Sequence, residues 1–297
     1  MSVATDPITT PVAPSIDPGT DLGTVRLTVS DVSRSRSFYE QALGLIASDR
    51  DDGSLVLGAG GGQPLIELRG DSSAPPLNRR LTGLYHLAIL VPTRLDLALA
   101  MARLAESHWP LDGASDHLVS EALYLSDPDG NGIEIYRDRP REEWRRNAGQ
   151  LEMATLPLDL NGLVRELSQA ERFQVHAPAG TRIGHVHLQV ADLAEAEAFY
   201  SGVLGFDVVV RGYPGALFVS AGGYHHHIGL NTWHSAGSRP PSPAAVGLRS
   251  FEIALPSDEA LDAVLARVRA AGIAVAAHGS GSLIRDPSGN GVLLRAR

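Results

Sequence analysis

Three side chains of this sequence could together hold a metal ion: His86, Glu134 and His185. Two imidazoles and one carboxylate form the facial ligand set that binds iron(II) and leaves coordination positions open for small molecules. The chain has no cysteine, which excludes thiolate metal sites, disulfides and cysteine nucleophiles. Because the three residues are far apart in the sequence, the fold must bring them together.

An internal repeat explains how distant residues can meet. Residues 23–29 and 184–190 are similar strand sequences, and each is followed at the same spacing by a helix that ends in Phe-Tyr. Residues 127–134 and 286–293 share an Asp-Pro-x-Gly-Asn-Gly turn before a last strand. We expect four βαβββ modules, at about 22–69, 84–136, 183–231 and 248–295. One such module cannot bury its sheet alone, so the modules should pair into two cupped half-barrels.

The four modules act as internal controls for one another. The first-strand position holds Thr24, His86, His185 and Ser250, and the last-strand position holds Glu67, Glu134, Gly229 and Leu293. Successive strand residues point to opposite faces, so equivalent positions of paired modules share a face. If modules two and three share a cup, its interior contains both histidines and Glu134. The cup of modules one and four then contains no metal-binding set.

These features resemble the vicinal oxygen chelate superfamily, which has the glyoxalase/bleomycin resistance/extradiol dioxygenase fold. Residues 184–190 (Gly-His-Val-His-Leu-Gln-Val), 111–136 and 225–233 are similar to the type I extradiol, catechol 2,3-dioxygenase-like enzymes. The resemblance covers nearly everything after residue 22. It implies an α+β fold and an oxidoreductase of aromatic catabolism. Such an enzyme uses O2 to cleave the ring of a small aromatic diol beside its two hydroxyls.

The resemblance also implies which residues bind the metal. The ligand roles fall on His86, Glu134 and His185, and the ion is expected to be Fe(II), although Mn(II) accepts the same ligands. Two other functions stay open. One is a glyoxalase-like metal-dependent isomerase or lyase, which uses a fourth protein ligand where this chain has Gly229. The other is a metal-free small-molecule-binding protein of the bleomycin-resistance kind.

Three further residues have catalytic roles by the same resemblance. His226 falls where these enzymes place an acid–base histidine, just before the last strand of the module that lacks the glutamate. Tyr124, six residues before Gly130 of the tight turn, is expected to hydrogen-bond the substrate. His117, in a loop, is expected to orient the diol or the ligands on the oxygen side. His187 lies two residues along the strand from His185, and we expect it to be structural.

Composition sets the remaining expectations. We predict a disordered tail at 1–21, a first domain at 22–137 with modules one and two, an outer linker at 138–180, and a second domain at 181–297 with modules three and four. The net charge of −9 argues against nucleic acid or an anionic membrane surface as partner. No apolar run approaches the roughly 18 residues that span a membrane. We therefore expect a cytoplasmic protein, and a homo-oligomer is possible.

Overall fold

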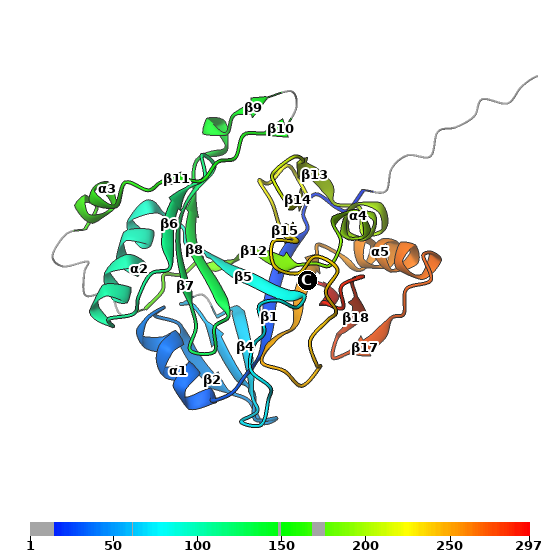
Figure 1. Cartoon of the computed structure of the whole chain (residues 1–297), viewed down its shortest axis with the longest axis horizontal. Helices are drawn as coiled ribbons and strands as arrows, with labels where there is room; N and C mark the ends of the chain where they lie inside the picture. Colours follow the sequence, from blue (N-terminus) through cyan, green and yellow to red (C-terminus); the bar gives the residue numbers. More distant parts are fainter. Residues whose placement is uncertain (1–14, 61, 148–149, 168–175) are drawn as a thin grey trace, which may run out of the picture.

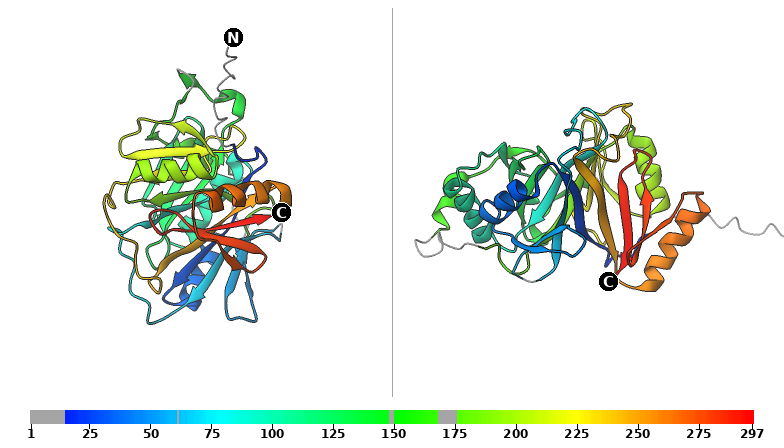
Figure 2. Two further views of the ribbon diagram at one scale, coloured as in Figure 1. Left: turned by 90° about the vertical axis from the view of Figure 1, so that its right-hand side faces the viewer. Right: turned by 90° about the horizontal axis from the view of Figure 1, so that it is seen from below.

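Two large mixed β-sheets, with helices on their outer sides, make up the fold (Figures 1 and 2). The computed structural model describes residues 15–60, 62–147, 150–167 and 176–297. The predicted α+β class and the four βαβββ modules are confirmed. Among the described residues, no helix has the length and apolar character needed to cross a membrane.

Modules two and three build the nine-stranded sheet. Its spatial order is β11 (Leu156–Pro157), β6 (Gly113–Asp116), β7 (Ser120–Ser126), β8 (Gly132–Asp138), β5 (Gly83–Leu90), β12 (Arg182–Gln189), β15 (Ile228–Asn231), β14 (Ala216–Ser220) and β13 (Asp207–Val210). The modules join where β5 and β12 pair antiparallel, with His86 opposite His187. The predicted pairing of modules two and three is therefore confirmed.

Modules one and four build the eight-stranded sheet. Its spatial order is β17 (Ala276–His278), β18 (Gly281–Arg285), β19 (Gly291–Ala296), β16 (Gly247–Leu255), β1 (Asp21–Val29), β4 (Pro64–Gly70), β3 (Leu55–Gly58) and β2 (Ile46–Asp49). Here the modules join where β1 and β16 pair antiparallel. Each sheet thus takes one module from each half of the chain, and the division into domains at 22–137 and 181–297 stays a prediction.

One helix of each module packs on the outer face of its sheet. The helices are α1 (Val32–Gln41), α2 (Arg94–Glu106), α4 (Leu193–Glu197), which continues as the π-helical segment η3 (Ala198–Val203), and α5 (Asp258–Ala270). Each begins after a capping residue whose side chain accepts a backbone N–H: Asp31, Thr93, Asp192 and Ser257. Such caps satisfy amide groups that lack partners in the first turn. The four helix starts are therefore encoded locally.

The repeated Phe-Tyr and Asp-Pro motifs bond to each other across modules. The hydroxyl of buried Tyr39 in module one donates to Asp127 in module two at 3.1 Å. In the other half of the chain, Tyr200 donates to Asp286 at 3.0 Å. The two aspartates also accept backbone N–H groups within their own turns. The motifs therefore serve the fold, and the chemistry has to come from elsewhere.

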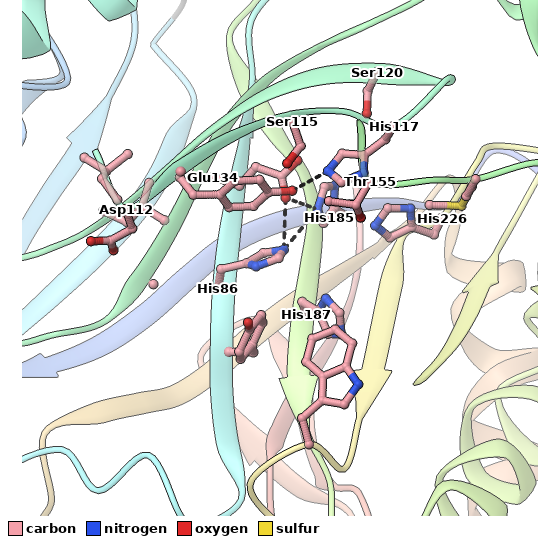
Figure 3. A pocket seen from close by; sticks show the side chains of 18 of the residues that line it. His86, Asp112, Ser115, His117, Ser120, Glu134, Thr155, His185, His187 and His226 are labelled. Carbon is pink, nitrogen blue, oxygen red and sulfur yellow. Dashed lines mark hydrogen bonds and ion pairs between the residues drawn. The ribbon is translucent and has the colours of Figure 1, made fainter. Parts of the chain in front are cut away.

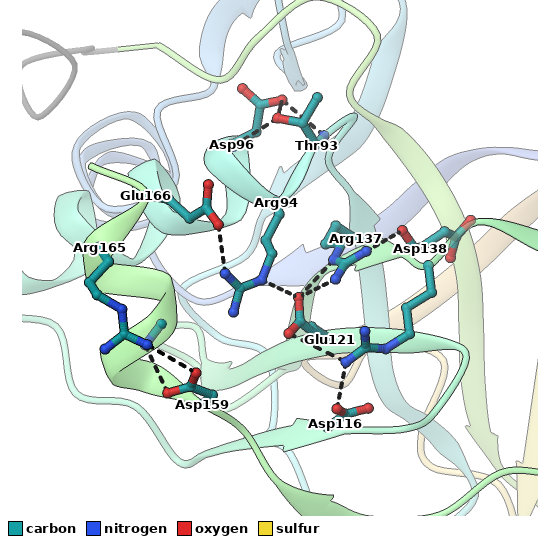
Figure 4. Close-up of polar contacts among 12 residues, drawn as sticks. Thr93, Arg94, Asp96, Asp116, Glu121, Arg137, Asp138, Asp159, Arg165 and Glu166 are labelled. Carbon is teal, nitrogen blue, oxygen red and sulfur yellow. Dashed lines mark hydrogen bonds and ion pairs between the residues drawn. The ribbon is translucent and has the colours of Figure 1, made fainter. Parts of the chain in front are cut away.

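The segment between the halves carries short elements: η1 (Arg141–Glu143), β9 (Arg146–Asn147), β10 (Gln150–Leu151), β11 and α3 (Leu160–Arg165). An ionic network ties it to module two (Figure 4). Buried Glu121 accepts from Arg94 at 2.9 Å and from Arg137 at 2.7 Å. Arg94 also donates to Glu166, just after α3, at 2.7 Å. This network holds the segment in a fixed place on the sheet.

The predicted tail, 1–21, needs a correction. Residues 1–14 lie outside the described residues. From Ser15 onward the chain packs on the body of the protein: Ile16 is buried, and its backbone N–H donates to the Gly205 carbonyl at 2.8 Å. Strand β1 already begins at Asp21. The prediction of disorder is therefore wrong for 15–21, because a buried isoleucine anchors this stretch.

Candidate metal centre

His86, Glu134 and His185 converge at the middle of the nine-stranded sheet (Figure 3). They lie on β5, β8 and β12, which are neighbours in that sheet. Glu134 Oε2 is 3.1 Å from His86 Nε2 and 3.1 Å from His185 Nε2, and the two nitrogens are 3.4 Å apart. All three side chains are buried. The predicted set is therefore assembled, although the strands that carry it are far apart in sequence.

The spacing of these atoms suits a single metal ion. Nitrogen and oxygen ligands bind such ions at about 2.0–2.2 Å, so two ligand atoms at right angles around one ion are ~3 Å apart. The observed separations of 3.1–3.4 Å agree with that value. The three residues thus fit a metal ion without rearrangement of the strands.

The protonation states also suit a metal. Burial raises the pKa of the Glu134 carboxyl, but the two neighbouring imidazoles outweigh burial and hold its pKa well below the usual range. Burial lowers the pKa of His185 to about 4, against the attraction of Glu134. At neutral pH the group is a carboxylate beside a neutral imidazole. Metal ligation requires these deprotonated forms.

A cavity of about 370 Å³ lies over the three residues. Module two supplies a largely polar wall, which includes Asp112, Ser115, His117, Ser120 and Ser126. Module three supplies a largely aromatic wall, which includes Tyr213, Phe218 and Trp233. Pockets for drug-sized ligands span ~300–1,000 Å³, so there is room for more than one small ring.

His117 and Tyr124 are bonded to each other at the edge of this cavity. His117 Nδ1 lies 2.7 Å from the Ala154 carbonyl, and its Nε2 lies 2.6 Å from the Tyr124 hydroxyl. A carbonyl only accepts, so Nδ1 carries the proton, and the neutral ring accepts from Tyr124 at Nε2. Burial, followed by the nearby Glu134 carboxylate, raises the pKa of Tyr124 well above its usual value. The tyrosine therefore stays protonated beside the three candidate ligands.

The connecting segment forms part of the cavity wall, which corrects the prediction that it lies only on the outside. Met153, Ala154 and Thr155 all line the cavity. Thr155 Oγ1 is 3.2 Å from the hydroxyl of Tyr213, in the turn between β13 and β14. The segment therefore closes one side of the site. Its role was not predicted, because these residues have no counterpart in any repeat.

His226 lies where the resemblance placed it, on the module-three side of the cavity. Its ring stacks at a tilt on that of His185, with the ring centres 4.1 Å apart. Burial, and then the surrounding imidazoles, lower the pKa of His226 well below its usual value. Its Nδ1 bonds to His225 at 2.8 Å, so only Nε2 is left for the cavity. His226 is thus a neutral imidazole at the cavity, beside the candidate metal centre.

His187, which we expected to be structural, also lies at this cavity. Its buried ring lines the cavity, and its Nε2 has no hydrogen-bond partner. A Cβ added to Gly229 would lie 2.9 Å from this ring, so the imidazole fills the space that a side chain at 229 would need. The rings of Tyr85 and Trp233 surround it, at 5.2 and 5.4 Å between centres. The His-x-His spacing, which puts both imidazoles on one face of β12, was the available signal.

The superfamily follows from these features together with sequence similarity. The profile of the glyoxalase/bleomycin resistance protein/dioxygenase superfamily matches residues 21–135 and 182–294. The chain belongs to this superfamily. A catechol-2,3-dioxygenase of Bacillus subtilis is 46% identical over 277 residues, which cover 92% of this chain and 96% of that protein. The sequence-based assignment of family and fold is therefore confirmed.

Solved structures of distant relatives agree on the fold. A candidate dioxygenase from Bacillus subtilis superposes with a TM-score of 0.62 at 14% identity, covering 96% of this chain and 86% of that one. Glyoxalase I from Zea mays superposes with a TM-score of 0.56 at 15% identity, covering 93% and 92%. At these identities the two structures support the fold alone. The identity to the Bacillus enzyme makes the chain an oxidoreductase of the dioxygenase class, as the sequence predicted.

Proposed function

We propose that the protein cleaves the ring of a catechol-type diol next to its two hydroxyls, with O2 as co-substrate and a non-haem Fe(II) held by His86, Glu134 and His185. The observation that carries this proposal is the convergence of two imidazoles and one carboxylate at 3.1–3.4 Å beneath a cavity. The 46% identity to a protein named catechol-2,3-dioxygenase supports it.

The charge of the three residues suits this chemistry. One carboxylate and two neutral imidazoles would leave a divalent ion with a net charge of about +1, which a singly deprotonated diol neutralises. The bound iron would supply open coordination positions and a route for electrons between the diol and dioxygen. Protein groups must then handle the protons.

His226 is the proposed acid–base group. The ring is neutral, and its unprotonated Nε2 can accept a proton from a diol hydroxyl in the cavity. The resulting imidazolium can later return that proton. Tyr124, whose hydroxyl proton is directed to His117, offers oxygen lone pairs to a substrate hydroxyl. His117 holds Tyr124 in that orientation and lines the cavity itself.

A glyoxalase-like isomerase is the runner-up, and Gly229 argues against it. An isomerase of this kind needs a fourth protein ligand at position 229. In this chain the residue is a glycine, and the His187 ring occupies the space next to it. A metal-free binding protein would have no use for a buried carboxylate between two buried imidazoles, because burial of an isolated charge is costly.

The proposal also covers the metal, the cell compartment and the partners. Manganese(II) is a possible substitute for iron, since both accept this ligand set. The chain has no cysteine, which fits a reducing compartment such as the cytoplasm. The partners are small molecules, and a homo-oligomer stays a possibility from the sequence.

Oxygen uptake by the iron-loaded protein tests the function across a panel of catechols. We expect one O2 consumed per diol and a ring-opened product heavier by two oxygen atoms, both labelled when 18O2 is used. The same protein, loaded with iron, manganese or zinc, should not isomerise a thiol–ketoaldehyde adduct. Isomerisation without oxygen uptake would replace this proposal with the glyoxalase-like one.

A further inference from the structure

A line of hydrogen bonds runs from His226 away from the cavity. His226 Nδ1 is 2.8 Å from His225 Nδ1, and His225 Nε2 is 2.9 Å from Asp138 Oδ1. His225 is completely buried, whereas the Asp138 side chain is 26% exposed. The line therefore links the group that faces the substrate cavity to a carboxylate at the end of β8.

The direction of each bond follows from what each atom can do. The Asp138 carboxylate only accepts, so His225 Nε2 carries a proton and donates it. A neutral His225 then has its lone pair on Nδ1, where it accepts from His226. His226 Nδ1 must carry the proton of that bond. A neutral His226 is left with its lone pair on Nε2, the nitrogen available to the cavity.

The surroundings hold this line in place. The His225 ring packs between Tyr224, at 4.1 Å between ring centres, and Trp144, at 5.4 Å. Tyr224 also donates to Asp138 at 3.2 Å, and its oxygen lies 2.7 Å from the hydroxyl of Tyr136. The Tyr136 hydroxyl in turn occupies the space over Gly184, where a Cβ would lie 1.8 Å from it. The glycine that precedes His185 is thus part of the same assembly.

We propose that Asp138 and His225 are positioning residues that fix the tautomer and the ring orientation of His226, so that its Nε2 is the base that faces the substrate. The inference rests on the proposed function only in the role of His226. The lone pair of a neutral His226 then lies on the nitrogen available to the diol, while its Nδ1 proton stays in the bond to His225. The arrangement extends the acid–base–orienter logic of hydrolase triads by one imidazole.

Nitrogen NMR of the full-length protein tests the tautomers directly. With Zn(II), which is diamagnetic, and also without metal, we expect 15N shifts that place the proton of His225 on Nε2 and that of His226 on Nδ1. In Asp138→Ala the fixed pattern should give way to a mixture of tautomers at both rings. A wild-type His226 with its proton on Nε2 would overturn the inference. This readout does not need turnover, so it stands apart from failure of the proposed function.

Kinetics of the iron-loaded protein give the second test. In Asp138→Ala we expect kcat to fall about 10- to 100-fold, the range found when an outer partner that orients a histidine is lost. Bound iron and the KM for the diol should not change.

His225→Phe keeps the ring packing and should show the same loss, which covers the case that the first variant folds poorly. Asp52→Ala, the same change at an exposed turn of module one where the carboxylate bonds to Ser54, is the control and should keep the native kcat. A native kcat in both Asp138→Ala and His225→Phe would refute the inference, as would an equal loss in Asp52→Ala.

Discussion

The two cups of this protein have the same topology and the same register, yet among the described residues only one of them assembles a candidate metal centre. In both, a glutamate stands on the last strand of one module, Glu134 in β8 and Glu67 in β4. Glu134 is surrounded by His86 and His185, whereas Glu67 pairs with Arg26 at 3.2 Å and with Arg249 at 3.3 Å. The positions of the two histidines are taken by Thr24 and Ser250.

The difference lies in how the carboxylate is neutralised. In the modules one–four cup, the fixed positive charge of Arg26 serves Glu67 and also Glu252, at 3.4 Å. In the modules two–three cup, Glu134 stands beside two imidazoles, and burial lowers the pKa of His185 to about 4. A carboxylate in that setting lacks a permanent cation unless a metal binds. The fold tolerates both solutions, so the metal centre is a property of side chains and not of topology.

The largest contrast should appear when the two glutamates are replaced in turn. Glu134→Ala removes one of three proposed ligands and should abolish most bound iron and with it oxygen uptake. Glu67→Ala should keep the iron, because its partners are arginines. Metal content per chain, measured after gel filtration, checks both. Equal loss in the two variants would show that the cups have been assigned the wrong way round.

The second contrast concerns the position before the last strand. His226 occupies this position in module three, three residues before Gly229. The equivalent residue of module one, three before Glu67, is Pro64, the first residue of β4. His226→Gln should retain iron and diol binding but lower kcat by about 10²- to 10⁴-fold, the usual contribution of general acid–base catalysis. Steady-state kinetics measures kcat, and a titration with the diol under anaerobic conditions measures binding. Turnover at the native rate would exclude His226 from the proton transfers.

The repeats explain why so much could be predicted from sequence. Modules that share a register put His86 and His185 at equivalent first-strand positions and Glu134 on a neighbouring last strand. One alignment therefore gave both the pairing of modules and the candidate ligands. Residues outside the repeats have no such control. Ala154, in the connecting segment, and Asp138, at its start, reach the site through contacts that no internal copy reveals.

The packing of His187 also depends on a residue outside its own strand. Its spacing from His185 predicts the correct face of the strand, but the ring takes its place only because residue 229 is a glycine on the neighbouring strand. A dependence between two strands of this kind follows from packing. It is not visible in the periodicity of either strand alone.

The third contrast uses this dependence. Gly229→Ala puts a Cβ 2.9 Å from the His187 ring, and overpacking of this kind costs about 1–3 kcal/mol. We expect that loss in the free energy of unfolding, measured in urea, together with a higher KM for diols that carry a bulky ring substituent. Gly202→Ala is the matched control, because nothing lies within 4 Å of its added Cβ. A second change, His187→Ala, should recover part of the loss; a strictly additive double variant would mean that the two residues do not interact.

The smallest contrast is in the response to acid. Burial lowers the pKa values of His187, His226 and His227, all in module three, whereas His278 on β17 is exposed. Each lowered histidine stays neutral in the folded chain, while the unfolded chain binds a proton as pH falls below about 6.5. Stability is therefore lost as pH falls, with a slope of up to ~1.4 kcal/mol per pH unit for each such residue.

Urea unfolding of the metal-free protein between pH 7.5 and 5.5 measures that slope. His226→Gln should lower this slope by up to ~1.4 kcal/mol per pH unit, the contribution of one proton. His278→Gln should leave the slope unchanged. If the free energy of unfolding stayed constant over this range, or if both variants changed the slope alike, these buried imidazoles would not be neutral. His226 could then not be the free base that the proposed proton transfer requires.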